Sequence, residues 1–245
     1  MKIWKKKIGR NISRLYGVYN KFLPEKNGGL ILMYHSVSSI EKKSDIYDLN
    51  KDLFLEHMSL INELGNTSPL SLKSLGQSCI SVTFDDGYAN NLDIAAPILE
   101  QLNIPFTVYV TSDNIKSNDK QYLSVSGLRE LASIEGVSIG AHGKSHCKLA
   151  DCGIEQLNHE LIYSKKFIED TISAPVESMS YPHGSVDDNV ERSVENAGYD
   201  FAVSSCFGIN SGNINKFRAS RTDIWNNDTI RDFSAKINGN WDWMR

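Results

Sequence analysis

Three short segments of the sequence carry side chains that can bind a metal ion or move a proton. They are Thr-Phe-Asp-Asp-Gly at 83–87, His-Gly-Lys-Ser-His at 142–146 and Ser-Tyr-Pro-His-Gly at 180–184. In the first, two adjacent carboxylates point in different directions, so one can bind a metal while its neighbour accepts a proton. In the second, two histidines four residues apart lie on one face of a helical turn and can share one ion. In the third, a rigid turn can aim backbone N–H groups at a substrate.

Each segment also has a plain structural interpretation. Asp and Gly are common in turns and at helix N-caps, histidines are common on surfaces, and Tyr-Pro can simply end a strand. Taken together, however, Asp86, His142 and His146 supply one carboxylate and two imidazoles. Such a set leaves coordination positions open, as catalytic metal sites do. The donors suit Zn²⁺, and Co²⁺, Ni²⁺, Mn²⁺ or iron would fit them as well.

From Gly29 onward, short apolar runs alternate with helical patterns. Buried strands are predicted at 30–34, 79–84, 106–110, 137–141, 178–181 and 201–203, and helices at 50–64, 92–102, 126–133, 154–171 and 186–197. This alternation indicates βαβ units and a parallel sheet, which fits a barrel and an open doubly wound sheet equally well. In both folds functional residues gather at the carboxyl ends of strands, where all three segments lie.

The composition restricts the class of protein. The chain has 245 residues, of which 40% are hydrophobic and 23% charged, so one soluble domain with a buried core is expected. No run of about 18 apolar residues is present, which argues against a transmembrane segment. Four cysteines are too few for a disulfide scaffold. A net charge of −4 argues against a nucleic-acid-binding protein.

The first 26 residues differ from the rest in charge. They contain eight Lys or Arg and one Glu, and apolar residues recur at helical spacing: Trp4, Ile8, Ile12, Leu15, Tyr19 and Phe22. This pattern predicts a basic amphipathic helix, whose apolar face either packs on its own domain or lies on an anionic membrane through residues 1–23. Pro24 and the glycines at 28–29 punctuate the chain there. We therefore divide it into a helical segment at 1–26 and a main domain at 27–245.

The basic segment has no continuous apolar stretch and no small-residue cleavage site, so we do not interpret it as a secretory signal. We expect a cytoplasmic protein, held at the inner face of the membrane if the helix binds lipid. Unpaired cysteines suit that compartment. Nothing in the sequence indicates the oligomeric state.

In their order and spacing, the three segments closely resemble the motifs of the polysaccharide deacetylases of carbohydrate esterase family 4. The flanking sequence agrees, because Leu-Met-Tyr-His-Ser-Val at 32–37 is similar to the start of the bacterial poly-N-acetylglucosamine deacetylase branch. The resemblance covers roughly residues 29–210. It implies a distorted (β/α) barrel with about seven strands and a divalent metal. It also implies removal of N-acetyl groups from a glycan, a polysaccharide or a lipid-linked saccharide.

The resemblance also assigns roles to individual residues. Asp86, His142 and His146 match the metal ligands, and Asp85 matches the catalytic base. The backbone N–H of His183 falls where the family stabilises the oxyanion. Tyr181 and Pro182 fall among the substrate-binding positions.

Two departures from the family pattern bear on the mechanism. Ser180 stands where the family often has an arginine that holds the base, so Arg221, otherwise grouped with the substrate-binding residues, is a candidate to pair with Asp85. No histidine follows His183, so the usual late catalytic acid is missing. His35 fits the early position that supplies the acid in the poly-N-acetylglucosamine branch, although it could also be an ordinary histidine at a strand end.

The chemistry expected of such a site is hydrolysis of an amide. A metal polarises the acetyl carbonyl and acidifies water, Asp85 takes the proton, and His35 protonates the departing sugar nitrogen. One alternative is a catalytically inactive, deacetylase-like sugar-binding protein, supported by the missing arginine and late histidine. Another is a 2-His-1-carboxylate iron oxygenase, whose usual double-sheet fold does not suit the alternation of strands and helices.

Overall fold

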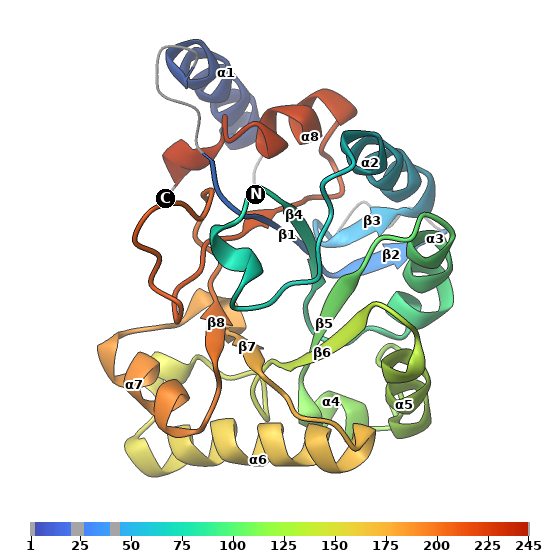
Figure 1. The fold of residues 1–245 in the computed structure, drawn as a ribbon, viewed down its shortest axis with the longest axis vertical. Helices are drawn as coiled ribbons and strands as arrows, with labels where there is room; N and C mark the ends of the chain where they lie inside the picture. The colour runs from blue at the N-terminus through green and yellow to red at the C-terminus, as the bar shows by residue number, and fades with distance from the viewer. Residues whose placement is uncertain (1–2, 21–26, 40–44, 245) are drawn as a thin grey trace.

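The computed structural model describes residues 3–20, 27–39 and 45–244, and its centre is a curled sheet of seven parallel strands (Figure 1). The strands are β1 (Leu30–Tyr34), β4 (Ile80–Phe84), β5 (Phe106–Val110), β6 (Val137–Ala141), β7 (Ser178–Ser180), β8 (Phe201–Val203) and β9 (Thr222–Asp223). Their order across the sheet is β8-β7-β6-β5-β4-β1-β9. A separate parallel pair consists of β2 (Ser36–Ser38) and β3 (Asp48–Asn50). The expected distorted (β/α) barrel with seven strands is confirmed.

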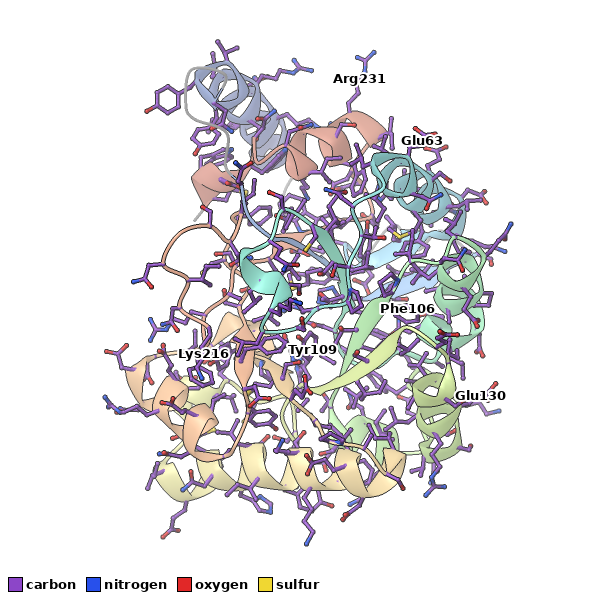
Figure 2. All side chains as sticks on the ribbon, in the orientation of Figure 1. Glu63, Phe106, Tyr109, Glu130, Lys216 and Arg231 are labelled. Carbon is purple, nitrogen blue, oxygen red and sulfur yellow. The ribbon has the colours of Figure 1, made fainter. Side chains whose placement is uncertain are left out.

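Helices surround this sheet in Figure 1. They are α1 (Ile3–Asn20), α2 (Lys51–Leu64), α3 (Ala96–Gln101), α4 (Ser112–Lys116), α5 (Val125–Ser133), α6 (Ile154–Ile172), α7 (Asp188–Asn196) and α8 (Ile230–Ile237). Every residue of β1, β4 and β5 is buried, as expected for parallel strands covered on both faces. Figure 2 shows Phe106 and Tyr109 within the body of the molecule and Glu63 and Glu130 on its outside. Among the described residues, no helix is long and apolar enough to cross a membrane.

The chain after residue 220 holds elements that the sequence pattern did not predict. Strand β9 has two residues, which is too short for any periodicity to show. Helix α8 begins at a capping box, in which the Thr229 side chain accepts from the backbone of Asp232 and the Asp232 side chain accepts in return. The predicted helix at 92–102 also differs, because a π-helical turn at Asn91–Ala95 precedes α3.

The register of the strands brings distant chemical groups together. Tyr34 at the end of β1 pairs with Phe84 at the end of β4, and the backbone N–H of Asp85 donates to Tyr34 O at 2.9 Å. His35 and Asp85 therefore leave the sheet side by side. The backbone N–H of His142 donates to Val110 O at 2.9 Å, which places it at the same edge. The carboxyl ends of these strands carry the candidate site.

Candidate active site

Asp86, His142 and His146 lie together as a set of metal donors. One ligand atom from each residue lies within 4.8 Å of the other two. His146 Nε2 is 3.1 Å from Asp86 Oδ1, and His142 Nε2 is 3.5 Å from the same oxygen. The two imidazoles and the carboxylate thus converge on one point.

The surroundings of these donors fit a divalent cation. Asp86 Oδ1 is buried and has no hydrogen bond of good geometry to any described residue, although His146 Nε2 lies close to it. His142 Nδ1 lies 2.9 Å from Ser180 O, a contact that makes Nδ1 the donor and leaves Nε2 free to bind a metal. Together with the donor types, this geometry fits Zn²⁺ or another divalent transition metal with open coordination positions.

Electrostatics within the cluster favours a bound positive charge. Burial alone would raise the pKa of Asp86, but the two histidines outweigh it and hold that pKa below its usual value. The contact with Asp86 raises the pKa of His146, whereas burial lowers the pKa of His142. A cation that replaces the proton on His146 would keep the attraction to Asp86.

The loop that carries the two histidines is not helical, so the predicted helical turn is wrong. Gly143 and His146 adopt left-handed backbone conformations, with φ values of 71° and 61°. Glu160 of α6 accepts hydrogen bonds from the backbone N–H groups of Lys144 and Ser145 at 2.8 and 2.9 Å. The histidines meet because α6 holds this loop and not because they follow a helical repeat.

Asp85 lies beside this cluster, buried and held by Arg221. Arg221 Nη1 lies 2.7 Å from Asp85 Oδ1, and Nη2 lies 2.7 Å from Oδ2, which is a bidentate pair. Ser180 Oγ donates to Asp85 Oδ2 at 3.0 Å, and Arg221 Nε donates to Ser204 O at 2.9 Å. The expected contact between Arg221 and Asp85 is therefore present. Burial alone would raise the pKa of Asp85, but Arg221 and His142 together hold it well below its usual range.

His35 stands at the end of β1, with a second buried carboxylate near it. Its Nδ1 atom is buried and has no hydrogen-bond partner in the described part of the chain, and its ring centroid lies 4.2 Å from that of Tyr47. Burial raises the pKa of Asp223 on β9, and His35 is the strongest influence against that rise. The Trp225 indole donates to Asp223 Oδ2 at 2.6 Å. The sequence analysis missed Asp223 because only the pairing of β9 with β1 places it there.

The third motif, residues 180–184, does not present all of its side chains to a substrate. The Tyr181 hydroxyl donates to Phe217 O at 2.8 Å, and the side chains of Tyr181 and Pro182 are buried. Arg221 is buried as well, so the structure favours supporting roles over direct contact for Tyr181 and Arg221. His183 has a left-handed backbone with φ 58° and an exposed side chain. Its ring centroid is 4.5 Å from that of His146, so its side chain borders the metal donors.

Aromatic side chains near the cluster were also missed. The rings of Tyr88 and Tyr122 stack with centroids 5.2 Å apart. Burial and then the Asp86 carboxylate raise the pKa of both hydroxyls, which places the pair near the metal donors. By contrast, Trp225 and Trp241 near the C-terminus are buried in the core.

Comparison with known proteins identifies the family. The polysaccharide deacetylase profile matches residues 73–202, more than half of the chain. The chain belongs to the polysaccharide deacetylase family. It is similar to YxkH of Bacillus subtilis (strain 168), whose name places it among the polysaccharide deacetylases, with 28% identity over 184 residues. That alignment covers 71% of this chain and 63% of the relative.

Several solved structures have the same fold. The deacetylase PplD of Streptococcus pyogenes, in complex with acetate, has a TM-score of 0.77 at 20% identity, covering 86% of this chain and 98% of that one. IcaB from Ammonifex degensii has a TM-score of 0.73 at 14% identity, covering 89% and 98%. BC0361, a polysaccharide deacetylase from Bacillus cereus, has a TM-score of 0.75 at 24% identity, covering 88% and 70%.

Proposed function

We propose that this protein is a metal-dependent hydrolase that removes acetyl groups from N-acetylated sugars in a glycan, polysaccharide or lipid-linked saccharide. One observation carries the proposal: a complete donor set of Asp86, His142 and His146 lies beside Asp85, a buried carboxylate held by Arg221. A protein that only binds sugars has no chemical need for that adjacent base. Membership of the polysaccharide deacetylase family supplies the substrate class.

Asp86, His142 and His146 would hold the metal. Bound there, Zn²⁺, or Co²⁺, Ni²⁺ or Mn²⁺ in its place, would supply Lewis-acid polarisation of the acetyl carbonyl and lower the pKa of water. Asp85 is the base that accepts the proton of the attacking water. Because Arg221 keeps this carboxylate ionised, it is ready to accept a proton at neutral pH.

The reaction forms a bond from the water oxygen to the acetyl carbon and breaks the bond from that carbon to the sugar nitrogen. His35 donates a proton to the departing nitrogen, so that acetate and a free amine result. Asp223, which pairs with Met33 between β9 and β1, lies close enough to His35 to interact with it electrostatically. The backbone N–H of His183 serves the developing oxyanion.

We assign substrate binding to the aromatic side chains near the metal donors. These are Tyr47, Tyr88 and Tyr122, here called the aromatic rim. The half-buried ring of Tyr122, stacked on Tyr88, offers an apolar face to a pyranose ring. Tyr47, which lies against His35, offers another at the acid side of the site. These rings contact the apolar face of a sugar ring and do not distinguish individual hydroxyl groups, so they can bind sugars of different linkage.

The decisive experiment measures acetate released from N-acetylglucosamine oligomers by purified protein, with metal content determined on the same samples. Wild-type protein is expected to release acetate and to hold about one divalent ion per chain, the number that one three-ligand site accepts. Asp85→Asn should keep the metal and lose most of the activity. Asp188→Asn, which changes an exposed aspartate paired with Arg218, is the matched control and should behave as wild type.

The outcomes separate the alternatives. Bound metal without acetate release from any N-acetylated sugar, soluble or lipid-linked, would favour the inactive sugar-binding protein. A folded protein that binds no divalent metal would overturn the ligand assignment. Oxygen consumption by an iron-loaded sample would favour the oxygenase.

A further inference from the structure

From Ile8 onward, helix α1 presents most of its apolar side chains to solvent and not to the rest of the protein. Leu15 is 73% exposed, and Ile8, Ile12, Val18 and Tyr19 are exposed as well. The interpretation that the apolar face packs on its own domain is therefore wrong for the described residues. Residues 1–2 and 21–23 of the predicted amphipathic segment lie outside the described part of the chain, as do the side chains of residues 3–7, including Trp4.

The opposite face of α1 is made of small residues that pack closely on the C-terminal segment. They are Gly9, Ser13 and Gly17, at a spacing of four. A Cβ added to Gly9 would lie 3.3 Å from the ring of Trp241, and one added to Gly17 would meet a side-chain nitrogen at 2.8 Å. Ser13 Oγ accepts from the indole of Trp243 at 2.9 Å. Because this contact needs small residues, the helix cannot simply rotate to bury its apolar face.

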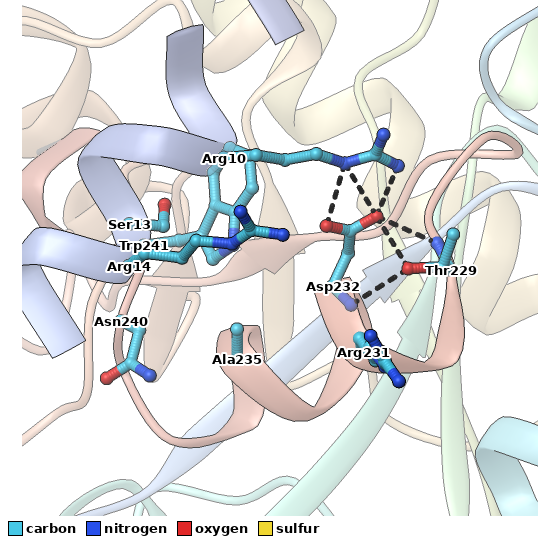
Figure 3. A pocket seen from close by; sticks show the side chains of 9 residues that line it. All are labelled: Arg10, Ser13, Arg14, Thr229, Arg231, Asp232, Ala235, Asn240 and Trp241. Carbon is cyan, nitrogen blue, oxygen red and sulfur yellow. Dashed lines mark hydrogen bonds and ion pairs between the residues drawn. The ribbon is translucent and has the colours of Figure 1, made fainter. Parts of the chain in front are cut away.

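An arginine-lined cleft adjoins the exposed face (Figure 3). It lies between α1 and α8, has a volume of about 500 Å³, and is bordered by Arg10, Arg14 and Arg231. Arg10 Nε lies 2.9 and 3.0 Å from the two carboxylate oxygens of Asp232, so its charge is paired. Arg14 and Arg231 are exposed, and Figure 3 shows neither bonded to the other residues drawn. Figure 2 shows Arg231 pointing outward at the end of the molecule where α1 lies in Figure 1.

The distribution of charge indicates which partner binds the exposed face of α1. Residues 1–26 carry a net charge of +7, and the rest of the chain carries −11. An anionic surface would attract the first segment and repel the body, which orients the molecule. A second copy of the chain would bring another segment of the same charge against this one, which is unfavourable.

We propose that α1 and the arginine cleft bind the surface of a bilayer containing anionic lipids. The apolar face lies at the boundary of headgroups and acyl chains, and Arg14 and Arg231 bind lipid phosphates. Arg10 also donates to Asn227 O at 3.3 Å, in the loop between β9 and α8. The docking surface thus borders the edge of the sheet that carries the candidate site.

Co-sedimentation of the full chain with lipid vesicles tests this proposal. The chain should sediment with vesicles of phosphatidylcholine mixed with phosphatidylglycerol, much less with phosphatidylcholine alone, and less as salt rises. Leu15→Asp should lower the partition coefficient at least about tenfold. Arg14→Gln and Arg231→Gln should each lower it about fivefold. Ile162→Asp, on α6 at the far end of the molecule in Figure 1 and 54% exposed, is the matched control and should change nothing.

Each variant is checked by circular dichroism, by thermal unfolding and by acetate release from a soluble N-acetylated oligomer. All three should match wild type, which keeps failure of membrane binding separate from failure of the proposed function. Equal binding of Leu15→Asp and Ile162→Asp, equal binding to neutral and anionic vesicles, or no wild-type binding at low salt would each overturn the proposal. A lipid-free dimer that Leu15→Asp dissociates would assign the face to a second copy instead.

Discussion

Arg221 and Lys236 each bring a cation into the interior to meet an aspartate, but the two ion pairs face different surroundings. Arg221 holds both oxygens of Asp85, and Asp85 Oδ2 lies 4.0 Å from His142 Nε2 among the metal donors. Lys236 Nζ lies 2.6 Å from Asp228 Oδ2, and both side chains are fully buried. That second pair is enclosed by aromatic rings, with Lys236 Nζ 3.7 Å from the centroid of Trp225.

This difference indicates that the carboxylate of Asp85 serves the reaction, whereas the carboxylate of Asp228 stabilises the fold. Lys236 also donates to Asp223 O at 2.6 Å, so the second pair holds the end of β9 and the loop that follows it. The first pair instead leaves an ionised carboxylate next to a metal site. Both pairs are buried and join one cation to one carboxylate, so their position relative to the metal donors is what separates their roles.

The largest expected effect comes from making the same change in both aspartates. Asp85→Asn should lower the rate of acetate release by about 10²–10⁴-fold, because the base is lost. Asp228→Asn should keep the rate per folded molecule within about threefold, although it destabilises the fold. Steady-state rates, normalised to the folded fraction, check this prediction. Equal losses in the two variants would show that Asp85 is also only structural.

Removing either cation should cost stability to a similar extent. Arg221→Gln and Lys236→Met each strand a buried carboxylate, which typically costs about 3–5 kcal/mol. In the wild type the folded-state pKa of Asp85 lies below the unfolded value of about 3.9. Its pairing therefore stabilises the fold above that pH, and this stabilisation is lost as pH falls through the folded-state pKa.

In Arg221→Gln, burial without the cation should raise the folded-state pKa of Asp85 above its unfolded value. The loss of unfolding free energy relative to wild type should therefore be largest at neutral pH and shrink on acidification. Urea unfolding at pH 7 and at pH 5 measures it. A deficit that does not depend on pH would contradict the assignment of Arg221 as the group that holds Asp85 ionised.

The pH dependence of kcat/KM should distinguish the role of Arg221 from that of Lys236. In the wild type Asp85 stays ionised across the acid range, so acid inactivation reports other groups. In Arg221→Gln its pKa rises, and the acid limb of kcat/KM should move up by at least about one pH unit. Arg221→Lys should restore most of the wild-type profile, and Lys236→Met should move it less than Arg221→Gln does, because Lys236 contacts Asp223 and not Asp85. An unchanged profile in Arg221→Gln would remove the role of Arg221.

The smallest effect is expected at the aromatic rim. Tyr122→Ala should raise KM for a soluble N-acetylated oligomer about fivefold, the loss of roughly 1 kcal/mol of ring contact, with kcat little changed. Tyr19→Ala on α1, which removes a tyrosine ring far from the metal donors in the sequence, should leave both constants unchanged. Kinetics over a range of oligomer concentrations test this pair. A fall in kcat alone for Tyr122→Ala would place that ring in the chemistry and not in binding.

The sequence alone determined those features that depend on residues close together in the chain. Apolar runs predicted the six longer strands of the sheet, because a strand buried on both faces needs apolar residues throughout. Asp85 and Asp86 follow one such strand directly, and His35 follows another, so their place at the carboxyl edge came from local order. The metal donors could be chosen from residue type and motif order alone.

Only the tertiary structure decided the features that depend on contacts between distant segments. Asp223 reaches His35 because the two-residue β9 pairs with β1, a contact with no local signature. The bend of the histidine loop depends on Glu160, and the orientation of α1 depends on how closely its small residues approach Trp241 and Trp243. An amphipathic pattern identifies the apolar face of a helix, but close packing decides whether that face is buried or exposed.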